Sequence, residues 1–463
     1  MRPGLAARVA AYRCLEAVDA QDAYANLAMP GILADAGLAG RDAAFATEVA
    51  YGAIRMRGLY DAILASAAKR DVVALEAPVL RVLRIGAHQA LSMRVPAHAA
   101  VSETVALMRE YRPGAAGLAN AVMRRVTEAD LDTWRARVAP GDTDEDFAIR
   151  HSHPVWVVRR LREALAADGR DGELEALLAA HNEPASVTLV ARPGLVSRDD
   201  LLAEAPGSTP TPFSPLGVVF AGGDPGRVPA VADGRAAVQD EGSQVVALAS
   251  ARPDATTGAE HESWHDMCAG PGGKAAILAC LAAERGAHLD ATELHPHRAR
   301  LVEEALRAVD PAVVTVRAGD ARVVADTYDR ILIDAPCTGL GALRRRPEAR
   351  WRRSEADLDD LIRLQAELLT AALRSLAPGG VLAYVTCSPV VDETRESIRR
   401  ALAGPSGHGV ERLDAREYVA AATATAPGEW GAGPDVQMWT HAHGTDSMFL
   451  ALLKSRSGAR GSQ

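Results

Sequence analysis

The chain has 463 residues, a formal net charge of -9, 48% hydrophobic residues and 24% charged residues, a composition typical of two to four globular domains. An acidic chain is not coated in basic residues, so any binding of nucleic acid must come from local basic patches. No run of about 18 apolar residues occurs, and the sequence therefore predicts no membrane span.

The five cysteines are widely spaced and form no C-x-x-C pair, which argues against a disulfide framework and against a zinc site. The N-terminal segment MRPGLAARVAAYRCLEAV has the pattern of an amphipathic helix and lacks a cleavable signal. We therefore expect a cytoplasmic protein that holds no metal.

The first part of the chain, residues 1–137, is predicted to be all helix. Apolar residues recur at helical spacing in several stretches, and Pro and Gly residues mark the breaks, one of them at Pro30-Gly31. Residues 138–150 are acidic and have the character of a linker. The segment 138–240 is predicted to contain linker helices followed by a small α+β module, because β-leaning runs there alternate with Pro and Gly.

Residues 241–454 alternate predicted strands and helices. Apolar strand candidates at 313–317, 330–334, 381–386 and 447–453 are separated by helical segments, which predicts a Rossmann-like, doubly wound α/β sheet. Ligands of such sheets bind beyond the carboxyl ends of the strands. The tail, residues 455–463, is predicted to be disordered.

A glycine-rich loop follows the first predicted strand of this domain. The sequence Asp266-Met-Cys-Ala-Gly-Pro-Gly-Gly-Lys274 would open a helix at its lysine and expose helix N–H groups to a ligand. Its spacing fits neither the P-loop G-x-x-x-x-G-K-[ST] nor the dinucleotide pattern G-x-G-x-x-G. An S-adenosylmethionine loop remains, formed by Cys268, Ala269, Gly270, Pro271, Gly272, Gly273 and Lys274.

Two acids follow the next strands. Glu293 lies about 20 residues beyond the loop, at the end of the second strand, where a carboxylate can accept hydrogen bonds from both hydroxyls of a ribose. Asp320 follows the strand 313–317 and can meet the amino group of an adenine. Alone each signal is weak, and together with the loop they favour a bound nucleoside.

Two further strands end in a cysteine. The run Ile-Leu-Ile-Asp334-Ala-Pro-Cys337-Thr-Gly is followed by an arginine cluster around Trp351, which suits phosphate contacts and base stacking. The predicted RNA-binding residues are Arg344, Arg345, Arg346, Arg350 and Trp351. The strand 381–386 ends in Thr386-Cys387-Ser388.

These groups suit methylation of carbon 5 of a cytosine. A thiolate that adds to carbon 6 makes carbon 5 nucleophilic toward a sulfonium methyl group, which is covalent catalysis. The carboxylic acid of Asp334 can bond to the ring nitrogen, and the second cysteine can assist release of the first. The chemistry alone leaves open which of Cys337 and Cys387 attacks.

The motifs resemble those of a known family. Residues from about 150 to 454 resemble the Sun/Fmu-type RNA cytosine methyltransferases, the small-subunit ribosomal RNA methyltransferase B subgroup. The matching runs are VQDEGSQ at 238–244, the loop CAGPGGK, Asp334-Ala-Pro-Cys337-Thr-Gly with RRPEARW, Thr386-Cys387-Ser388 and GTDSMF at 444–449. Segments 41–64 and 98–126 resemble the NusB-like domain that is fused to such enzymes.

The resemblance implies that Cys387 is the nucleophile and that Cys337 aids product release. It also implies that the loop 268–274, Glu293, Asp320 and Asp334 bind S-adenosylmethionine, and that the NusB-like domain helps to bind small-subunit ribosomal RNA. Three positions depart from the family pattern: Gly270 stands where Ala is common, Glu293 where Asp is usual, and Thr338 where Ser is more common.

Two alternatives stay open. A transfer RNA or DNA cytosine methyltransferase would share the chemistry, and in the DNA enzymes the attacking residue would be the Pro-Cys cysteine, Cys337. A noncatalytic RNA-binding assembly factor would not need the two cysteines, Asp334 and the glycine loop to be intact.

Overall fold

The computed structural model describes residues 3–21, 23–93, 95–323 and 326–457. It divides into two units. The first, here called the helical unit, comprises Met1–Arg160, Leu174–Pro184 and Leu343–Arg353. The second, the sheet unit, comprises Leu161–Glu173, Ala185–Ala342 and Ser354–Gln463. The last six residues of the predicted tail, 458–463, lie outside the described residues.

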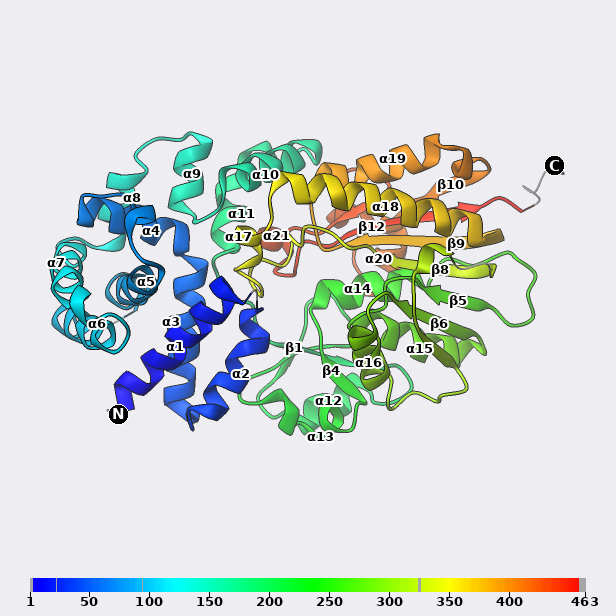
Figure 1. Ribbon diagram of the computed structural model, residues 1–463. Coiled ribbons are helices and arrows are strands. Elements are labelled where there is room, and N and C mark those ends of the chain that lie inside the picture. The colour runs from blue at the N-terminus through cyan, green and yellow to red at the C-terminus, as the bar shows by residue number, and fades with distance from the viewer. Residues whose placement is uncertain (1–2, 22, 94, 324–325, 458–463) are drawn as a thin grey trace. The chain divides into compact units, whose positions relative to one another are not determined.

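The helical unit is built from α-helices, as the periodicity predicts (Figure 1). Its helices are α1 (Pro3–Ala20), α2 (Ala25–Asp35), α3 (Gly40–Arg55), α4 (Arg57–Ala68), α5 (Ala77–Leu91), α6 (Ala97–Tyr111), α7 (Ala116–Val126), α8 (Leu131–Val138), α9 (Asp144–Arg150), α11 (Leu174–Ala180) and α17 (Ala349–Arg352). Helix α10 (Val155–Ala167) follows α9 in the chain. One continuous hydrophobic core joins helices α1 to α8, with Tyr12, Tyr60 and Met108 fully buried in it.

The structure of the helical unit differs from two of the sequence predictions. The predicted break at Pro30-Gly31 is wrong, because helix α2 continues through Pro30. Proline removes one helical hydrogen bond, but Ala25 and Met29 are buried in the core and hold the segment in place. The acidic residues of the predicted linker form the first turn of α9, where Thr143 and Asp146 make a capping box.

The sheet unit contains a small and a large sheet. The small sheet has the order β2-β3-β1-β4, all antiparallel, and the large sheet has the order β10-β12-β9-β8-β5-β6-β7, with β11 paired to β12. The strands are β1 (Thr188–Ala191), β2 (Thr209–Pro210), β3 (Gly217–Val219), β4 (Ala236–Val238), β5 (Ser263–Asp266), β6 (His288–Glu293), β7 (Val314–Ala318), β8 (Tyr328–Asp334), β9 (Leu376–Thr386), β10 (Val410–Leu413), β11 (Val436–Gln437) and β12 (Phe449–Ser455).

The five strands β5 to β9 pair in parallel, and β12 joins β9 antiparallel. The helices of the unit are α12 (Arg198–Glu204), α13 (Pro229–Ala232), α14 (Glu241–Ser250), α15 (Gly273–Arg285), α16 (Pro296–Ala305), α18 (Glu355–Ser375), α19 (Arg395–Ala403), α20 (Ala415–Thr423) and α21 (Thr440–His443). The alternation of strand and helix confirms the predicted Rossmann-like architecture.

Both faces of the large sheet are buried. Along β9 the side chains alternate, so that Leu382 and Tyr384 join the core beneath α18 and α19, whereas Ala383 and Val385 join the core beneath α14, α15 and α20 (Figure 1). Because both faces are covered, the carboxyl edge of the parallel strands is where polar groups can gather.

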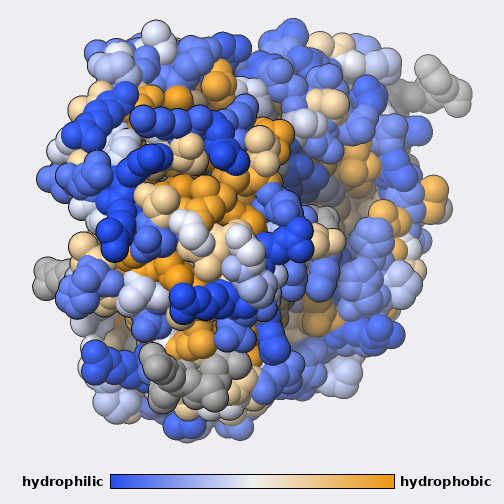
Figure 2. Space-filling model, turned by 60° about the vertical axis from the view of Figure 1, so that its left-hand side comes forward, coloured by the Kyte–Doolittle hydropathy of each residue, from blue (hydrophilic) through white to orange (hydrophobic). Residues whose placement is uncertain are grey.

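The outer surface is mixed. In the face shown in Figure 2, hydrophobic side chains gather in patches that hydrophilic ones border. Among the described residues, no helix is long and apolar enough to cross a membrane.

Candidate active site

Four polar groups meet at the carboxyl edge of the large sheet. Asp266 ends β5, Glu293 ends β6, Asp334 ends β8, and Cys387 directly follows β9. These strands are adjacent and parallel in the order β9-β8-β5-β6, so their ends lie at one edge. The topology thus brings the predicted cofactor and catalytic residues together.

The glycine loop between β5 and α15 is held close to the sheet. Ala269 N–H donates to the carbonyl of Thr292, and Gly272, with φ of 109°, is the N-cap of α15. A Cβ at Gly272 would lie 2.4 Å from the Cβ of Ala305. Only glycine fits there, because both the φ angle and the contact exclude a side chain.

Gly270 and Glu293 are packed closely together. A Cβ at position 270 would lie 2.2 Å from Oε2 of Glu293, which is buried at 4% exposure. A side chain at position 270 would therefore collide with the Glu293 carboxylate. Arg298 donates to the carbonyl of Gly270 at 2.8 Å and lies 3.5 Å from the Glu293 carboxylate, so the loop and the acid are fixed to each other.

Asp266 is a residue of this site that the sequence analysis did not select, although it opens the quoted motif. Its side chain is fully buried, Oδ1 accepts from Cys268 N–H at 3.3 Å, and Oδ2 has no hydrogen-bond partner among the described residues. Burial, together with the charge of Asp334, raises the pKa of Asp266 to about 7. A buried carboxylate with one unpaired oxygen among the described residues, beside Glu293 and Asp334, adds negative charge to the loop, which fits a cationic ligand such as S-adenosylmethionine.

The protonation of Asp266 predicts how cofactor affinity depends on pH. A bound cation favours the ionised carboxylate, so binding must release the proton that Asp266 holds below pH 7. We expect S-adenosylmethionine affinity to fall about tenfold per pH unit as the pH drops below 7. Titration calorimetry in two buffers of different ionisation enthalpy measures the released proton.

Asp266→Asn, which cannot titrate, is the matched control. It should bind more weakly at pH 8 and should show little pH dependence between 6 and 8. An equally steep pH dependence in this variant would assign the proton to another group.

Asp320 follows β7, as predicted, and its carboxylate forms an ion pair with Arg322 at 2.6 Å. The hydrogen bonds from Arg322 hold the pKa of Asp320 below its usual range. The predicted contact of Asp320 with an adenine stays a prediction, and it requires the carboxylate to be shared with Arg322.

Lys274 and Asp334 form the central ion pair. Lys274 extends from the first turn of α15, and its Nζ donates to Oδ2 of Asp334 at 2.8 Å. Burial alone would lower the pKa of Lys274, but the Asp334 carboxylate outweighs burial and raises it. A lysine at this place is therefore a permanent cation within the site.

The two cysteines at the ends of β8 and β9 are adjacent. Sγ of Cys337 lies 3.4 Å from Sγ of Cys387, within the range of a thiol hydrogen bond. The hydrogen bond from Cys337 lowers the pKa of Cys387, and Lys274 acts in the same direction against burial and Asp334. The same bond and burial raise the pKa of Cys337. The 3.4 Å contact allows either sulfur to donate, and the directions of the two pKa shifts favour a Cys387 thiolate beside a Cys337 thiol.

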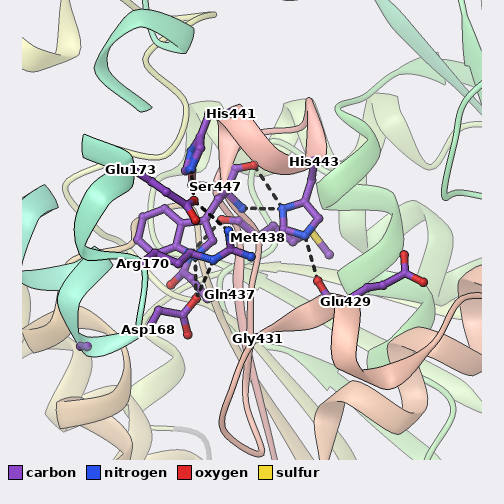
Figure 3. A network of polar contacts seen from close by, with 12 residues as sticks. Asp168, Arg170, Glu173, Glu429, Gly431, Gln437, Met438, His441, His443 and Ser447 are labelled. Atoms are coloured by element: carbon purple, nitrogen blue, oxygen red, sulfur yellow. Dashed lines mark hydrogen bonds and ion pairs between the residues drawn. The ribbon is translucent and has the colours of Figure 1, made fainter. Parts of the chain in front are cut away.

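The segment 436–447 borders the catalytic loops and is anchored by a polar network (Figure 3). Ser447 N–H donates to Gly341, whose own N–H donates to the carbonyl of Cys387, both at 2.9 Å. In the network, Trp439 Nε1 donates to the buried Asp168 carboxylate at 2.7 Å, and His441 bonds to Glu173 at 2.6 Å. These bonds fix the backbone beside the cysteines.

The arginine run after Cys337 belongs to the helical unit. Arg350 is fully buried there and donates to the carbonyls of Ser152 and His181 and to Oδ1 of Asn182. Arg350 is therefore not accessible to RNA in this conformation, which is a correction to its predicted role. Burial lowers the pKa of Arg350 to about 9.

The other predicted RNA-binding residues are more accessible. Arg346 is exposed, and its guanidinium lies 5.2 Å from the ring of Tyr24. Arg344, Arg345 and Trp351 are half-buried, with Trp351 under the guanidinium of Arg57 at 5.5 Å. Their contact with RNA stays a prediction.

Substitution of Arg350 should affect mainly stability, whereas substitution of Arg346 should affect mainly RNA affinity. Arg350→Ala removes a buried guanidinium that donates to three acceptors, so we expect a loss of about 2–4 kcal/mol in the free energy of unfolding. Arg346→Ala should leave stability within about 0.5 kcal/mol and weaken RNA binding with a smaller salt dependence. Chemical denaturation and filter binding at two salt concentrations measure both; equal effects of the two variants on stability would contradict the assignment.

Among the described residues, no group of three or more His, Cys, Asp or Glu side chains could hold a metal ion. Glu393 and Gln365 were not predicted as site residues, yet both hydrogen-bond to the cysteine loops. Gln365 could have been selected from the sequence, because it is a polar residue in the apolar stripe of α18 between Leu358 and Leu368.

A Rossmann-like sheet with a glycine loop, an acid at the end of β6 and a thiol pair beside a lysine–aspartate pair defines an S-adenosylmethionine-dependent methyltransferase. Residues 255–454 match the family model described as 16S rRNA methyltransferase RsmB/F, and residues 5–128 match that of the NusB family. The chain belongs to the RsmB/F family.

Relatives extend this match over the whole chain. The Mycobacterium tuberculosis protein Rv1407, named as a methyltransferase, is 46% identical over 98% of this chain and 97% of its own. Ribosomal RNA small subunit methyltransferase B of Pseudomonas putida is 34% identical over 86% of this chain and 89% of its own.

Two solved structures share the fold. The crystal structure of PH0851 has a TM-score of 0.77 and 21% identity, and the alignment covers 98% of this chain and 99% of that one. The structure of NSun6 from Pyrococcus horikoshii, solved with SFG, has a TM-score of 0.52 and 19% identity over 64% of this chain and 98% of its own.

Proposed function

We propose that the protein methylates carbon 5 of a cytosine in small-subunit ribosomal RNA through a covalent bond between Cys387 and carbon 6. The observation that carries this proposal is the thiol pair, because Sγ of Cys387 lies 3.4 Å from Sγ of Cys337 and close enough to Lys274 for its charge to lower the Cys387 pKa. A methyltransferase acting on a nitrogen or oxygen atom needs no such pair.

The residues have separate tasks in this reaction. When bound, S-adenosylmethionine supplies an electrophilic methyl group. The Cys387 thiolate attacks carbon 6 of the cytosine, which gives carbon 5 the electron density to form the new carbon–carbon bond. Asp334, held by Lys274 at 2.8 Å, is assigned to bond to the ring nitrogen and so to favour the addition.

Product release requires two bonds to break. A base removes the proton on carbon 5, and the electron pair left there expels Cys387 as a thiolate. Sγ of Cys337 lies 3.4 Å from the departing sulfur, and its raised pKa keeps it protonated to serve as the proton donor. The proposal thus assigns attack to Cys387 and release to Cys337.

The choice of RNA rests on the family and on the helical unit. The relative from Pseudomonas putida is named as a ribosomal RNA small subunit enzyme, and residues 5–128 match the NusB family. The cytosine must be unstacked from a loop of the RNA to reach a site at the edge of the sheet.

The direct test uses purified protein, labelled S-adenosylmethionine and small-subunit ribosomal RNA from cells that lack the corresponding modification. We expect label in 5-methylcytosine after complete digestion of the RNA to nucleosides. Label in another nucleoside would exclude the cytosine chemistry, and methylation of transfer RNA or DNA alone would exclude the ribosomal substrate. Cofactor binding without any transfer would favour a noncatalytic assembly factor.

A further inference from the structure

A buried carboxylate connects the two cysteine loops. Glu393 ends the 3-10 turn Val391–Glu393 after β9 and has no exposed surface. Its Oε1 accepts from Thr338 N–H at 2.7 Å, and its Oε2 accepts from the hydroxyls of Thr338 at 2.5 Å and Ser388 at 2.6 Å. Thr338 directly follows Cys337, and Ser388 directly follows Cys387. One side chain therefore binds the residue next to each thiol.

Gln365 supports the same arrangement from α18. Its Nε2 donates to the carbonyl of Pro336 at 2.9 Å and to Oε1 of Glu393 at 3.2 Å. The loop that carries Cys337 is thus held on both sides of the cysteine, at Pro336 and at Thr338. The hydroxyl oxygens of Thr338 and Ser388 lie 3.1 Å apart, and each gives its single proton to Glu393.

The hydrogen-bond count shows that the site is built for a carboxylate. Each oxygen of Glu393 receives two donors, which satisfies its acceptor capacity as an anion. Burial raises the pKa of Glu393, and the bonds from Ser388 and Thr338 oppose that shift. An unsatisfied network of this kind would be costly in a buried place, whereas a satisfied one fixes its members in a single geometry.

We propose that Glu393 is a positioning residue that sets the separation of the Cys337 and Cys387 thiols by binding Thr338 and Ser388 at once. The role of the pair in catalysis rests on the proposed function, but the geometric claim does not. The departure at Thr338 fits this proposal, because threonine keeps the hydroxyl that a serine would offer. Glu393 acts through the cysteines and touches no substrate.

The geometric claim is tested without any substrate. Diamide takes up two electrons and two protons as two neighbouring thiols form a disulfide, so its reaction rate reports their separation. In the wild type we expect a Cys337–Cys387 disulfide, identified by mass spectrometry of the linked peptides. Glu393→Ala should form it at least about tenfold more slowly, and Glu393→Gln, which keeps one acceptor oxygen, should fall between the two.

The matched control is Thr394→Val, which removes a buried hydroxyl one residue away. Thr394 Oγ1 donates to the carbonyl of Val390 at 2.9 Å, so this variant loses a hydrogen bond of the same turn without touching either cysteine loop. S-adenosylmethionine affinity, measured by calorimetry, should stay within about twofold of wild type in all three variants and shows that they are folded.

The catalytic consequence is a change in turnover rather than in binding. Glu393→Ala should lower kcat by about 10²-fold, the size of effect that a displacement of about 1 Å produces, with KM for RNA unchanged. RNA that contains 5-fluorocytosine has no removable proton at carbon 5 and traps the adduct, and its trapping rate should fall in parallel. Glu393→Gln should recover part of both rates.

Two results would overturn the proposal. One is disulfide formation in Glu393→Ala at the rate of Thr394→Val, which would show that the thiols keep their separation without the carboxylate. The other is a loss of active protein with unchanged kcat per cofactor-binding site, which would make Glu393 a stability residue only. If the wild type were inactive on RNA, the proposed function would fail while the diamide comparison would still decide the positioning role.

Discussion

Cys387→Ala is expected to abolish methyl transfer, with kcat lowered more than about 10³-fold and no covalent protein–RNA product. The proposal assigns the attack to Cys387, whose Sγ lies 3.4 Å from Sγ of Cys337 and whose pKa Lys274 helps to lower, so its removal should leave no nucleophile for the adduct. Transfer of labelled methyl groups to RNA and a denaturing gel measure the two effects.

Cys337→Ala is expected to behave differently, because it removes the proton donor for release and leaves the nucleophile. Methyl transfer should stop after the first turnover, and a covalent complex with methylated RNA should accumulate. Cys280→Ala, which removes a buried thiol of α15, is the control and should keep full activity. Loss of the adduct in Cys337→Ala with an active Cys387→Ala would reverse the roles and favour the DNA-type assignment.

Lys274→Met should produce the second large effect, a decrease in kcat of about 10²–10³-fold. The variant leaves the Asp334 carboxylate without its 2.8 Å partner and removes a cation that lowers the pKa of Cys387. With a higher thiol pKa, the rising limb of the pH–rate profile should move to higher pH. Stopped-time assays between pH 6 and 10 measure the shift.

Lys274→Arg keeps the charge and should retain the pH profile even where kcat falls, because the guanidinium is larger and changes the geometry. A double-mutant cycle with Asp334→Asn measures the coupling of the pair. An unshifted pH profile in Lys274→Met would show that the lysine does not control the thiol.

Much of the fold could be predicted from the sequence. Apolar runs at 330–334 and 381–386 are strands β8 and β9, and the helical periodicity of residues 1–137 produces the helical unit. These predictions succeed because burial of one face imposes a period on the sequence. The helix through Pro30 was not predictable, since its stability comes from the burial of Ala25 and Met29 against distant helices.

In the site, too, some features could be predicted from the sequence and others could not. The sequence predicts the glycine loop, Glu293, Asp334 and the two cysteines, because each stands at the end of a strand in a parallel sheet. It does not predict that the guanidinium of Arg350 is buried, because a run of arginines normally indicates a solvent-exposed segment. Three acceptors from two other segments of the helical unit bind that guanidinium, and no local pattern encodes them.

By itself the sequence determined the residue types at the strand ends, the glycines of the loop, and the helical and sheet-forming parts. Only the tertiary structure decided which residues of the site contact one another. It showed that a Cβ at position 270 would meet Glu293, that Oδ2 of Asp266 has no hydrogen-bond partner among the described residues, and that Glu393 joins the two cysteine loops. Local patterns report on neighbours along the chain, whereas these contacts join residues that meet only after the strands have paired.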